Sequence, residues 1–482
     1  MRGYQVRLPI VIAGRRIDRT SGDDQRITTR TNQHIDLPYL DTVIADHLES
    51  LPGDTLADVS IHEIISFLHN VGHNWKSPEY SRRRLYIRHL CKFLGYSEAM
   101  AEAEANWIAF NLSSHFRLYD SLSAELGGWQ MLEDWIPNEE AYIRALPHGK
   151  VFHLVPGNVP LSSVVSIIRA IITKNVSIVK ASSDDIITPI TLALSFMDVD
   201  RDHPVTRSLS VVHWPGGKDE AHHRQLVASA NAVCAWGATD SIEWAKRNAA
   251  PDSALLTFGP KRSLAVIGGD ADLEKAARAL AHDVSVYDQR ACFSIQHVYY
   301  EGDTDDLMEH LAAAFENIEL LLPKGEHSFD ERAGVSLSRL QSDFSCSKTI
   351  SSAKGAWTII AAPAGESDIH PLGRTVYLHA INTLTEVEPY IDRHTQTVAV
   401  YPADLAIAVR DRYTRQGACR IVELGMNNIF RVGGAHDGIF PLQRLVRMAS
   451  MELPSKANIK GIAIPVDQTR FLEEDRFLEF IP

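Results

Sequence analysis

One of the five cysteines, Cys292, lies where a reactive thiol is expected. It follows a helical stripe of apolar residues and precedes a strand-like stretch rich in β-branched and aromatic residues, "SIQHVYY". The stripe consists of Leu273, Ala277, Leu280, Val284 and Tyr287. The pattern therefore predicts that Cys292 sits on a turn with its sulfur accessible. An accessible, ionised thiol is a nucleophile, whereas a free cysteine is more often simply a buried core residue.

A second candidate is Asn158 in "HLVPGNVPLSSVV", which lies after a predicted strand and before a predicted helix. Pro156, Gly157 and Pro160 surround it and make the turn rigid. A side-chain amide held on such a turn can donate a hydrogen bond to an oxyanion. Its structural alternative is a helix N-cap, a position that asparagine also favours.

A third candidate is the junction in "AVCAWGATDSIEWAKR", where a buried strand runs into Gly237 and then into a helix that starts near Thr239. A glycine there lets a phosphate approach the backbone amides at the positive end of the helix. The alternative is an ordinary turn in which Thr239 or Asp240 caps the helix.

The helices and strands that position these residues can be predicted from the periodicity of apolar residues along the chain. Residues from about 55 to about 127 read as helices with one apolar face. Beyond Lys150, apolar runs such as "VFHLVP", "VSIVKA" and "AVCAWG" alternate with helical stretches, and a second alternating series ends near residue 440. Such alternation predicts an α/β protein with two doubly wound parallel sheets.

Composition excludes several classes of function. A formal net charge of −13 and a pI near 5.9 argue against a general nucleic-acid surface. The longest apolar region is interrupted by Arg169, Lys174 and Asn175, so no membrane span is expected. The five cysteines are scattered, which predicts reduced thiols in a cytoplasmic chain, without disulfides. No metal site is expected either, since His222 and His223 are neighbours on a predicted helix and point about 100° apart.

Taken in order, five fragments resemble the aldehyde dehydrogenase superfamily, and more closely the acyl-CoA reductases that supply aldehyde to bacterial luciferase. They are "VPGNVPL", "VSIVKASSD", "AWGATDS", "LLTFGPKRSLAVIGGDADLEKAA" and "DQRACFS", within about residues 145–450. "YDQRACFSIQHVYYE" and "HDGIFPLQRLVRMAS" favour the reductase branch. The resemblance implies a coenzyme-binding domain in residues 1–127 and 148–255, with a helical N-terminal region. It also implies a catalytic domain in residues 256–450 and oligomerisation elements in residues 128–147 and 451–482.

The resemblance also assigns roles to residues. Cys292 becomes the nucleophile, and Asn158 with the Cys292 backbone N–H becomes the oxyanion hole. Lys180 contacts the adenosine ribose of the coenzyme, and Gly237 faces its pyrophosphate. The other residues expected in the coenzyme site are Ser182, Ser183, Ala238 and Thr239.

Two departures from the aldehyde-oxidising pattern favour reduction. Thr257 in "LTFGP" stands where the hydrolytic enzymes carry a glutamate base, so no carboxylate is expected there to activate water. Ser183 in "KASS" stands where many relatives bind the ribose hydroxyls of NAD with a glutamate, which favours NADPH. A further family glutamate falls at His370 in "HPLGRT", which leaves the contact to the nicotinamide ribose open.

The function expected from this resemblance is the NADPH-dependent reduction of a long-chain acyl-CoA or acyl-protein thioester to the aldehyde, through an acyl-cysteine. One alternative is an acylating aldehyde dehydrogenase that runs in the oxidative direction. Another is a non-catalytic subunit that holds acyl groups. The resemblance also implies an acyl-protein synthetase partner and a homo-oligomer, in a pathway such as luminescence. Three sources of a lowered Cys292 pKa stay open: a helix N-terminus, Arg290 or the cationic nicotinamide.

Overall fold

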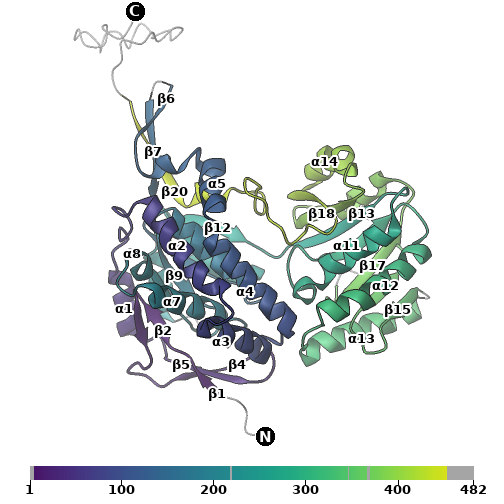
Figure 1. The fold of residues 1–482 in the computed structure, drawn as a ribbon, viewed down its shortest axis with the longest axis horizontal. Helices are drawn as coiled ribbons and strands as arrows, with labels where there is room; N and C mark the ends of the chain where they lie inside the picture. Colours follow the sequence, from purple (N-terminus) through teal and green to yellow (C-terminus); the bar gives the residue numbers. More distant parts are fainter. Residues whose placement is uncertain (1–4, 140, 218–219, 346, 366–369, 453–482) are drawn as a thin grey trace, which may run out of the picture.

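The computed structural model describes residues 5–139, 141–217, 220–345, 347–365 and 370–452 of the 482-residue chain. They form two α/β lobes, each built on a seven-stranded sheet (Figure 1). The expected fold class is confirmed, because each sheet is mostly parallel and packs against helices.

The sheet of the first lobe has the strand order β12-β11-β8-β9-β10-β2-β3. Its strands are β2 (Ile10–Ile12), β3 (Arg15–Ile17), β8 (Lys150–Leu154), β9 (Val176–Lys180), β10 (Leu209–Val212), β11 (Ala232–Trp236) and β12 (Ala254–Phe258). The strands from β12 to β10 are parallel, and β2 and β3 add an antiparallel edge. The loops that follow β11, β8 and β9 therefore lie at one edge of the sheet, where α/β proteins bind ligands.

Helices that connect these strands pack on the sheet, and α6 is the one beside the Asn158 loop. They are α6 (Pro160–Ile172), α7 (Ile187–Val199), α8 (Pro204–Arg207), α9 (Ala221–Ala228) and α10 (Thr239–Asn248). Helix α6 begins with a proline, which suits the first position of a helix, and buries Val164, Ile167 and Ile171.

The expected helical region contributes a layer in front of this sheet (Figure 1). It consists of α2 (Ile61–Lys76), α3 (Ser81–His89), the π-helical η1 (Leu90–Leu94), α4 (Glu98–Ser113), α5 (His115–Leu126) and the 3₁₀ turn η2 (Trp129–Leu132). The side chains of Ser60 and Ser97 cap α2 and α4 by accepting hydrogen bonds from backbone N–H groups. Before this layer come β1 (Gln5–Arg7), β4 (Gln25–Thr28), β5 (His34–Leu37) and α1 (Thr42–Ser50), with the small sheet ordered β1-β5-β4.

The sheet of the second lobe has the order β15-β16-β17-β14-β13-β18-β19 and is parallel except for β15. Its strands are β13 (Arg262–Ile267), β14 (Ile295–Tyr300), β15 (Lys348–Ser351), β16 (Thr358–Ala361), β17 (Thr375–Ala380), β18 (Thr395–Tyr401) and β19 (Arg420–Glu423). Its helices are α11 (Leu273–Ser285), η3 (Val286–Gln289), α12 (Thr304–Leu321), α13 (Phe329–Phe344), η4 (Leu384–Tyr390) and α14 (Leu405–Gln416).

A third, small sheet stands beside the first lobe and has the order β20-β7-β6. It comprises β6 (Ile136–Asn138), β7 (Ala141–Pro147) and β20 (Val446–Met451), and α15 (Pro441–Arg444) leads into it. Residues 128–147 thus provide two strands of this small sheet, β6 and β7. Its third strand, β20, comes from residues 446–451, about 300 positions later in the chain. Most of the expected element at residues 451–482, including the strand predicted in "IKGIAIP", lies outside the described residues.

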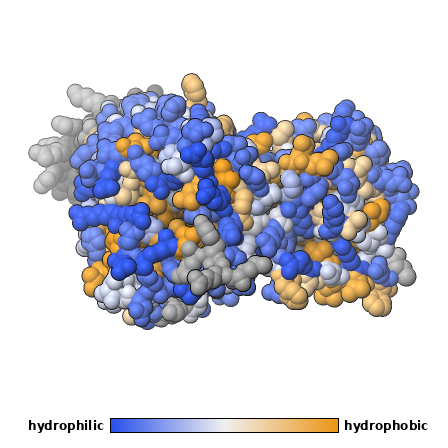
Figure 2. All heavy atoms as spheres, turned by 60° about the horizontal axis from the view of Figure 1, so that its bottom comes forward, coloured by the Kyte–Doolittle hydropathy of each residue, from blue (hydrophilic) through white to orange (hydrophobic). Residues whose placement is uncertain are grey.

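The surface carries mixed polar and apolar side chains, and Figure 2 shows the two lobes as separate bulges joined by a narrower waist. Large exposed apolar side chains concentrate at the end of α12 and along α13 and include Leu320, Leu321, Leu337, Leu340 and Phe344. Across the described segments, no helix is both long and apolar enough to cross a membrane. Cys91, Cys234, Cys292 and Cys419 are free thiols, as expected.

Candidate active site

A cavity of about 870 Å³ lies at the junction of the two lobes, and we call it the interlobe cavity. Its lining comes mainly from α4, α5, α6, the loops after β8, β9, β11 and β12, the segment that leads into β14, and residues 428–442. Cys292 and Asn158 both line it, as do Lys180, Ser182, Gly237 and Ala238. The sequence-predicted residues from separate loops therefore converge on one space.

The predicted turn at Cys292 is confirmed, and hydrogen bonds from the second lobe fix it. The Ser263 hydroxyl donates to the Cys292 carbonyl at 2.8 Å, and the Asn427 amide donates to the Phe293 carbonyl at 2.8 Å. The Cys292 backbone N–H has no carbonyl acceptor among the described residues. It is therefore available to a ligand in the cavity.

The backbone just before this turn is left-handed, which the sequence pattern did not predict. Helix α11 ends at Ser285, and Tyr287, Asp288 and Gln289 have φ values of 56°, 50° and 67°. The expectation that Tyr287 continues the helical stripe is therefore wrong. Left-handed backbone costs roughly 1–2 kcal/mol for each residue that is not glycine, so the surrounding structure must hold this segment in place.

Gln289 and Tyr287 anchor two ends of this segment. The Gln289 amide donates to the carbonyls of Ile295 and Thr375 at 2.7 and 2.6 Å and accepts from the Thr375 N–H at 2.9 Å. The Tyr287 hydroxyl donates to Glu104 of α4 at 2.5 Å. Burial raises the pKa of Glu104 to about 8, so its carboxyl group is largely protonated at neutral pH.

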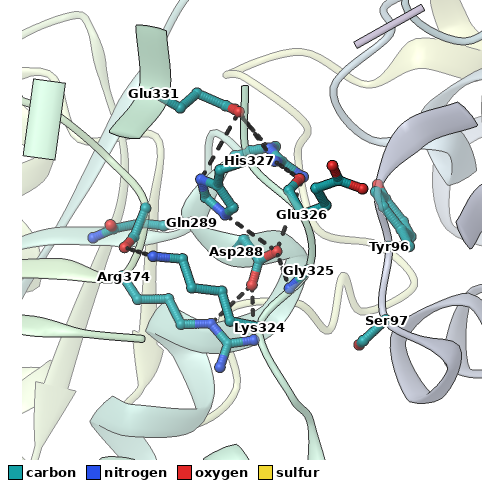
Figure 3. A network of polar contacts seen from close by, with 12 residues as sticks. Tyr96, Ser97, Asp288, Gln289, Lys324, Gly325, Glu326, His327, Glu331 and Arg374 are labelled. Atoms are coloured by element: carbon teal, nitrogen blue, oxygen red, sulfur yellow. Dashed lines mark hydrogen bonds and ion pairs between the residues drawn. The ribbon is translucent and has the colours of Figure 1, made fainter. Parts of the chain in front are cut away.

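Asp288 anchors the middle of the segment through a network of charges that crosses the second lobe (Figure 3). Its carboxylate is fully buried and receives Arg374 at 2.7 Å, the Gly325 N–H at 3.0 Å and His327 at 3.5 Å. Burial alone would raise the pKa of Asp288. The contact with His327 and the charges of Arg374 and Arg290 instead hold it well below its usual range.

Arg290 does not provide the positive charge beside Cys292 that was one of the open possibilities. Its guanidinium is buried and turned toward α13, where it forms an ion pair with Glu331 at 3.0 Å. Burial opposes ionisation of Glu331, but the Arg290 charge and hydrogen bond lower its pKa to about 2. Arg290 therefore holds the segment to α13, and only its backbone carbonyl faces Asn158.

The sulfur of Cys292 has one side-chain hydrogen-bond partner among the described residues. The Gln396 amide donates to Sγ at 3.0 Å and to the Asp437 carboxylate at 2.7 Å. Burial, followed by the Asp437 charge, raises the pKa of the thiol to about 12, and the hydrogen bond from Gln396 opposes this. Without coenzyme or substrate, the thiol is protonated at neutral pH.

Asn158 is not a helix cap, because α6 has Val159 as its N-cap and no side chain caps it. The Asn158 amide instead donates to the Arg290 carbonyl at 2.8 Å. This bond joins the two lobes and holds the amide beside Cys292. The second amide hydrogen has no acceptor among the described residues and is available to an oxygen in the cavity.

The β11–α10 junction has a backbone geometry that can admit a phosphate group. Gly237 has a φ of +128°, and Ala238 is the N-cap of α10 without any side-chain cap. The alternative in which Thr239 or Asp240 caps the helix is wrong. The backbone N–H groups at the start of α10 therefore receive no hydrogen bond acceptor from a capping side chain and can donate to an anion.

Lys180 ends β9 and lies over the Trp214 ring, with its amine 5.8 Å from the ring centroid. Burial lowers the pKa of Lys180 to about 8, and the charge of Asp184 opposes this. The loop after Lys180 packs tightly on Gly157, where an added Cβ would lie 2.4 Å from the Cβ of Asp184. Only glycine allows the loops after β8 and β9 to approach so closely.

Four positions singled out in the sequence do not line the cavity in the described part of the chain. Ser183 is half-buried, Thr239 is exposed and Thr257 is half-buried on β12. His370 packs against His297 and Tyr377, with ring centroids 5.5 and 5.4 Å apart.

His222, His223 and Glu220 do bring their ligand atoms within 4.8 Å of one another, closer than expected. The Tyr39 hydroxyl donates to Glu220, and His223 stacks on Trp214.

Sequence reasoning missed three polar residues of the site. Asp184 lines the cavity, although Ser183 beside it was expected to set the charge there. Asp437 also lines the cavity, and the buried Gln396 amide donates both to its carboxylate and to the Cys292 sulfur. The Asp-Gly pair in "HDGIF" signals a turn but does not reveal what the carboxylate contacts.

Comparison with known families and proteins gives consistent matches. Residues 56–448 match the family model described as Acyl-CoA reductase (LuxC). The chain is 44% identical over 478 residues to long-chain acyl-protein thioester reductase 2 of Photobacterium leiognathi, with 99% of each chain covered. It is 47% identical over 431 residues to the long-chain acyl-protein thioester reductase of Vibrio harveyi, covering 89% of this chain and 90% of the relative.

Solved structures show the fold. An aldehyde dehydrogenase from Brucella melitensis biovar abortus 2308 superposes with a TM-score of 0.74 at 15% identity, covering 92% of this chain and 96% of the other. The NADP-dependent glyceraldehyde-3-phosphate dehydrogenase from Bacillus halodurans C-125, complexed with NADP, gives a TM-score of 0.69 at 14% identity, with 92% and 98% covered. The two lobes therefore have the aldehyde dehydrogenase fold, as the ordered motifs implied.

The network around Asp288 predicts a large effect of substituting a residue that does not line the cavity. Arg374→Met leaves Asp288 buried without its main partner, and we expect a loss of about 3 kcal/mol or more in unfolding free energy, with a lower thermal midpoint. Arg278→Met is the matched control, because its ion pair with Glu274 is exposed. Equal thermal midpoints for the two variants would contradict the structural role of Arg374.

Proposed function

We infer the activity from the family: the chain belongs to the acyl-CoA reductase (LuxC) family and is an oxidoreductase that reduces an acyl thioester to a fatty aldehyde. We propose that its donor is a long-chain acyl group carried by a protein or by CoA. We also propose that the hydride comes from NADPH and that the reaction takes place in the cytoplasm. The observation that carries the chemistry is that Cys292 and Asn158 face one cavity from opposite lobes.

We propose that the Cys292 thiolate attacks the thioester carbonyl and that a new C–S bond forms. The Asn158 amide and the Cys292 N–H stabilise the tetrahedral oxyanion, whose collapse breaks the bond to the donor sulfur. The departing thiol takes a proton, and the acyl group remains on Cys292. No carboxylate occupies the Thr257 position, which favours survival of this acyl-cysteine over hydrolysis.

Bound NADPH supplies the hydride that reduces the acyl carbon. The residues suited to hold it are Lys180 for the adenosine ribose and its 2′-phosphate, and the N–H groups at the start of α10 for the pyrophosphate. Asn158 and the Cys292 N–H again hold the oxygen of the thiohemiacetal. When that oxygen re-forms a carbonyl, the C–S bond breaks, and the aldehyde and the thiolate are released.

The acyl chain is proposed to extend toward α4, α5 and α6. Apolar side chains from these helices line the cavity beyond Asn158, among them Trp107, Phe110, Leu118, Val165 and Ile168. Each buried methylene is worth about 0.8 kcal/mol, so such a wall favours long chains over short ones.

We further propose that the first lobe is the coenzyme-binding domain, that the second is the catalytic domain, and that the chain forms a homo-oligomer. The small sheet supports the last proposal, because β20 forms an open edge in the described residues and carries exposed Met448. The relatives are named as acyl-protein thioester reductases, which supports an acyl-protein synthetase as the partner that delivers the acyl group.

Incubation with a long-chain acyl-CoA and no coenzyme should add the mass of one acyl group to the protein, located at Cys292 by peptide mass spectrometry. NADPH should then remove it and release aldehyde. Cys292→Ala should gain no mass at that peptide, whereas Cys91→Ala should be acylated like the wild type. Aldehyde formation by Cys292→Ala would contradict covalent catalysis at this residue.

Asn158→Ala should lower kcat by about 100- to 1,000-fold, the usual effect of losing one oxyanion donor. Asn158→Asp, of similar size, loses both amide hydrogens, including the one that joins the lobes, and should lower kcat at least as much. Steady-state reduction rates measure both variants, and circular dichroism checks their folding. A kcat within tenfold of the wild type for a folded Asn158→Ala would rule out the oxyanion role.

Lys180→Met should lower kcat/KM for NADPH by about 10-fold or more relative to NADH, because a 2′-phosphate would lose a charged partner. Asp184→Asn should change the ratio in the opposite direction, since a carboxylate beside Lys180 repels that phosphate. With the Lys180 pKa near 8, the amine loses its charge as pH rises, so the wild-type preference for NADPH should fall above about pH 8. Unchanged ratios in both variants would place the 2′-phosphate elsewhere.

A further inference from the structure

Behind the sulfur of Cys292 lies a buried glutamine that no motif indicated. Gln396 is the second residue of β18 and is only 1% exposed. It does not line the interlobe cavity, whereas Cys292 and Asp437 do. Its amide nitrogen donates to Cys292 Sγ at 3.0 Å and to Asp437 Oδ1 at 2.7 Å.

Burial of the polar Gln396 amide within β18 must be compensated by hydrogen bonds. The residues from Thr395 to Val400 are all buried, and an unpaired polar group there costs free energy. Both amide hydrogens of Gln396 are used, one on the sulfur and one on the carboxylate. The amide oxygen has no partner among the described residues, so the contacts to Cys292 and Asp437 define its orientation.

We propose that Gln396 is a catalytic residue that donates a hydrogen bond to the Cys292 thiolate, and that Asp437 is the positioning residue that aims the amide. This rests on the proposed function in one respect, that Cys292 is the nucleophile. The N–H donation stabilises the thiolate before it attacks. It does so again when the thiolate leaves the thiohemiacetal, because a hydrogen bond to a charged acceptor is stronger than one to a neutral sulfur.

Gln396 and Asp437 act on the pKa of the thiol in opposite directions. The hydrogen bond lowers the thiol pKa, and the Asp437 charge raises it. Asp437 thus orients the Gln396 amide, but its negative charge also repels the Cys292 thiolate. Burial raises the pKa of Asp437 itself, so part of that repulsion is relieved when it takes up a proton.

Other charged and titratable groups face this cluster from each neighbouring element. Arg420 from β19 interacts electrostatically with Cys292, and it also donates to the carbonyls of Asn427 and Ile429. Lys261 and Arg169 act on Asp437, and the Arg169 guanidinium lies 3.0 Å from His436. Gln396 is the side chain that donates to the sulfur directly, so its removal should dominate over these longer-range effects.

The backbone of Asp437 is built for this placement. Its φ is 51°, and Gly438 follows with a φ of 84°. Aspartate and asparagine tolerate this left-handed conformation better than most residues. Asp437→Asn therefore keeps the backbone and an oxygen acceptor for Gln396 while removing the charge.

The experiment measures iodoacetamide alkylation of Cys292 in the full-length protein without coenzyme, from pH 7 to 9.5, with the modified peptide quantified by mass spectrometry. Because only the thiolate reacts and its pKa lies above this range, a rise in pKa slows alkylation at every pH. Gln396→Leu should react about 10-fold or more slowly than the wild type, the effect of losing a hydrogen bond to a charged group. Gln225→Leu, which removes a surface glutamine whose amide donates to Glu49 and which does not line the cavity, should react within about twofold of the wild type.

Asp437→Asn should react several-fold faster, because the repelling charge is gone and the amide stays aligned. This variant keeps the test decisive if Gln396→Leu fails to fold. An unchanged rate in folded Gln396→Leu, or slower alkylation in Asp437→Asn, would overturn the proposal. Absence of alkylation in the wild type would also overturn it, but Cys292 acylation by acyl-CoA would still support the proposed function.

Discussion

The site depends on a buried carboxylate that keeps a strained piece of backbone in place. Asp288 sits in the middle of three left-handed residues, and Arg374, His327 and the Gly325 N–H hold it. Without these contacts the segment would gain roughly 1–2 kcal/mol per residue by returning to right-handed backbone. The turn that carries Cys292 would then move, because it begins two residues after Gln289.

From this anchor the contacts spread to both lobes. Tyr287 reaches Glu104 in the first lobe, and the Arg290 carbonyl accepts from Asn158, while Gln396 approaches the sulfur from β18. The parallel sheet of the first lobe brings the loops after β8, β9 and β11 to the same edge. Each lobe thus contributes residues to the cavity between them, where the acyl group and the coenzyme are proposed to meet.

The sequence carried most of the fold and part of the site. Alternation of apolar runs and helices predicted both parallel sheets, since periodicity reports which face of an element is buried. The turn at Cys292 was predicted as well. The left-handed backbone at Tyr287–Gln289 was not, because none of these residue types favours it and distant ion pairs impose it. Gln396 and Asp437 were not predicted for a similar reason. They lie 104 and 145 positions after Cys292, and only tertiary packing brings them to its sulfur.

Because the neighbours of Cys292 come from distant parts of the sequence, the surroundings of its sulfur differ between the folded protein and the chain during synthesis and folding. Asn158 and Glu104 are synthesised before Cys292, whereas Gln396 and Asp437 are synthesised long after it. A nascent or half-folded chain therefore displays a sulfhydryl group that lacks its neighbours on at least one side. An unperturbed cysteine has a pKa of about 8.5, whereas burial raises that of the folded Cys292 thiol to about 12, so the incomplete chain presents the more ionised sulfhydryl and completion of the fold protects it from indiscriminate modification.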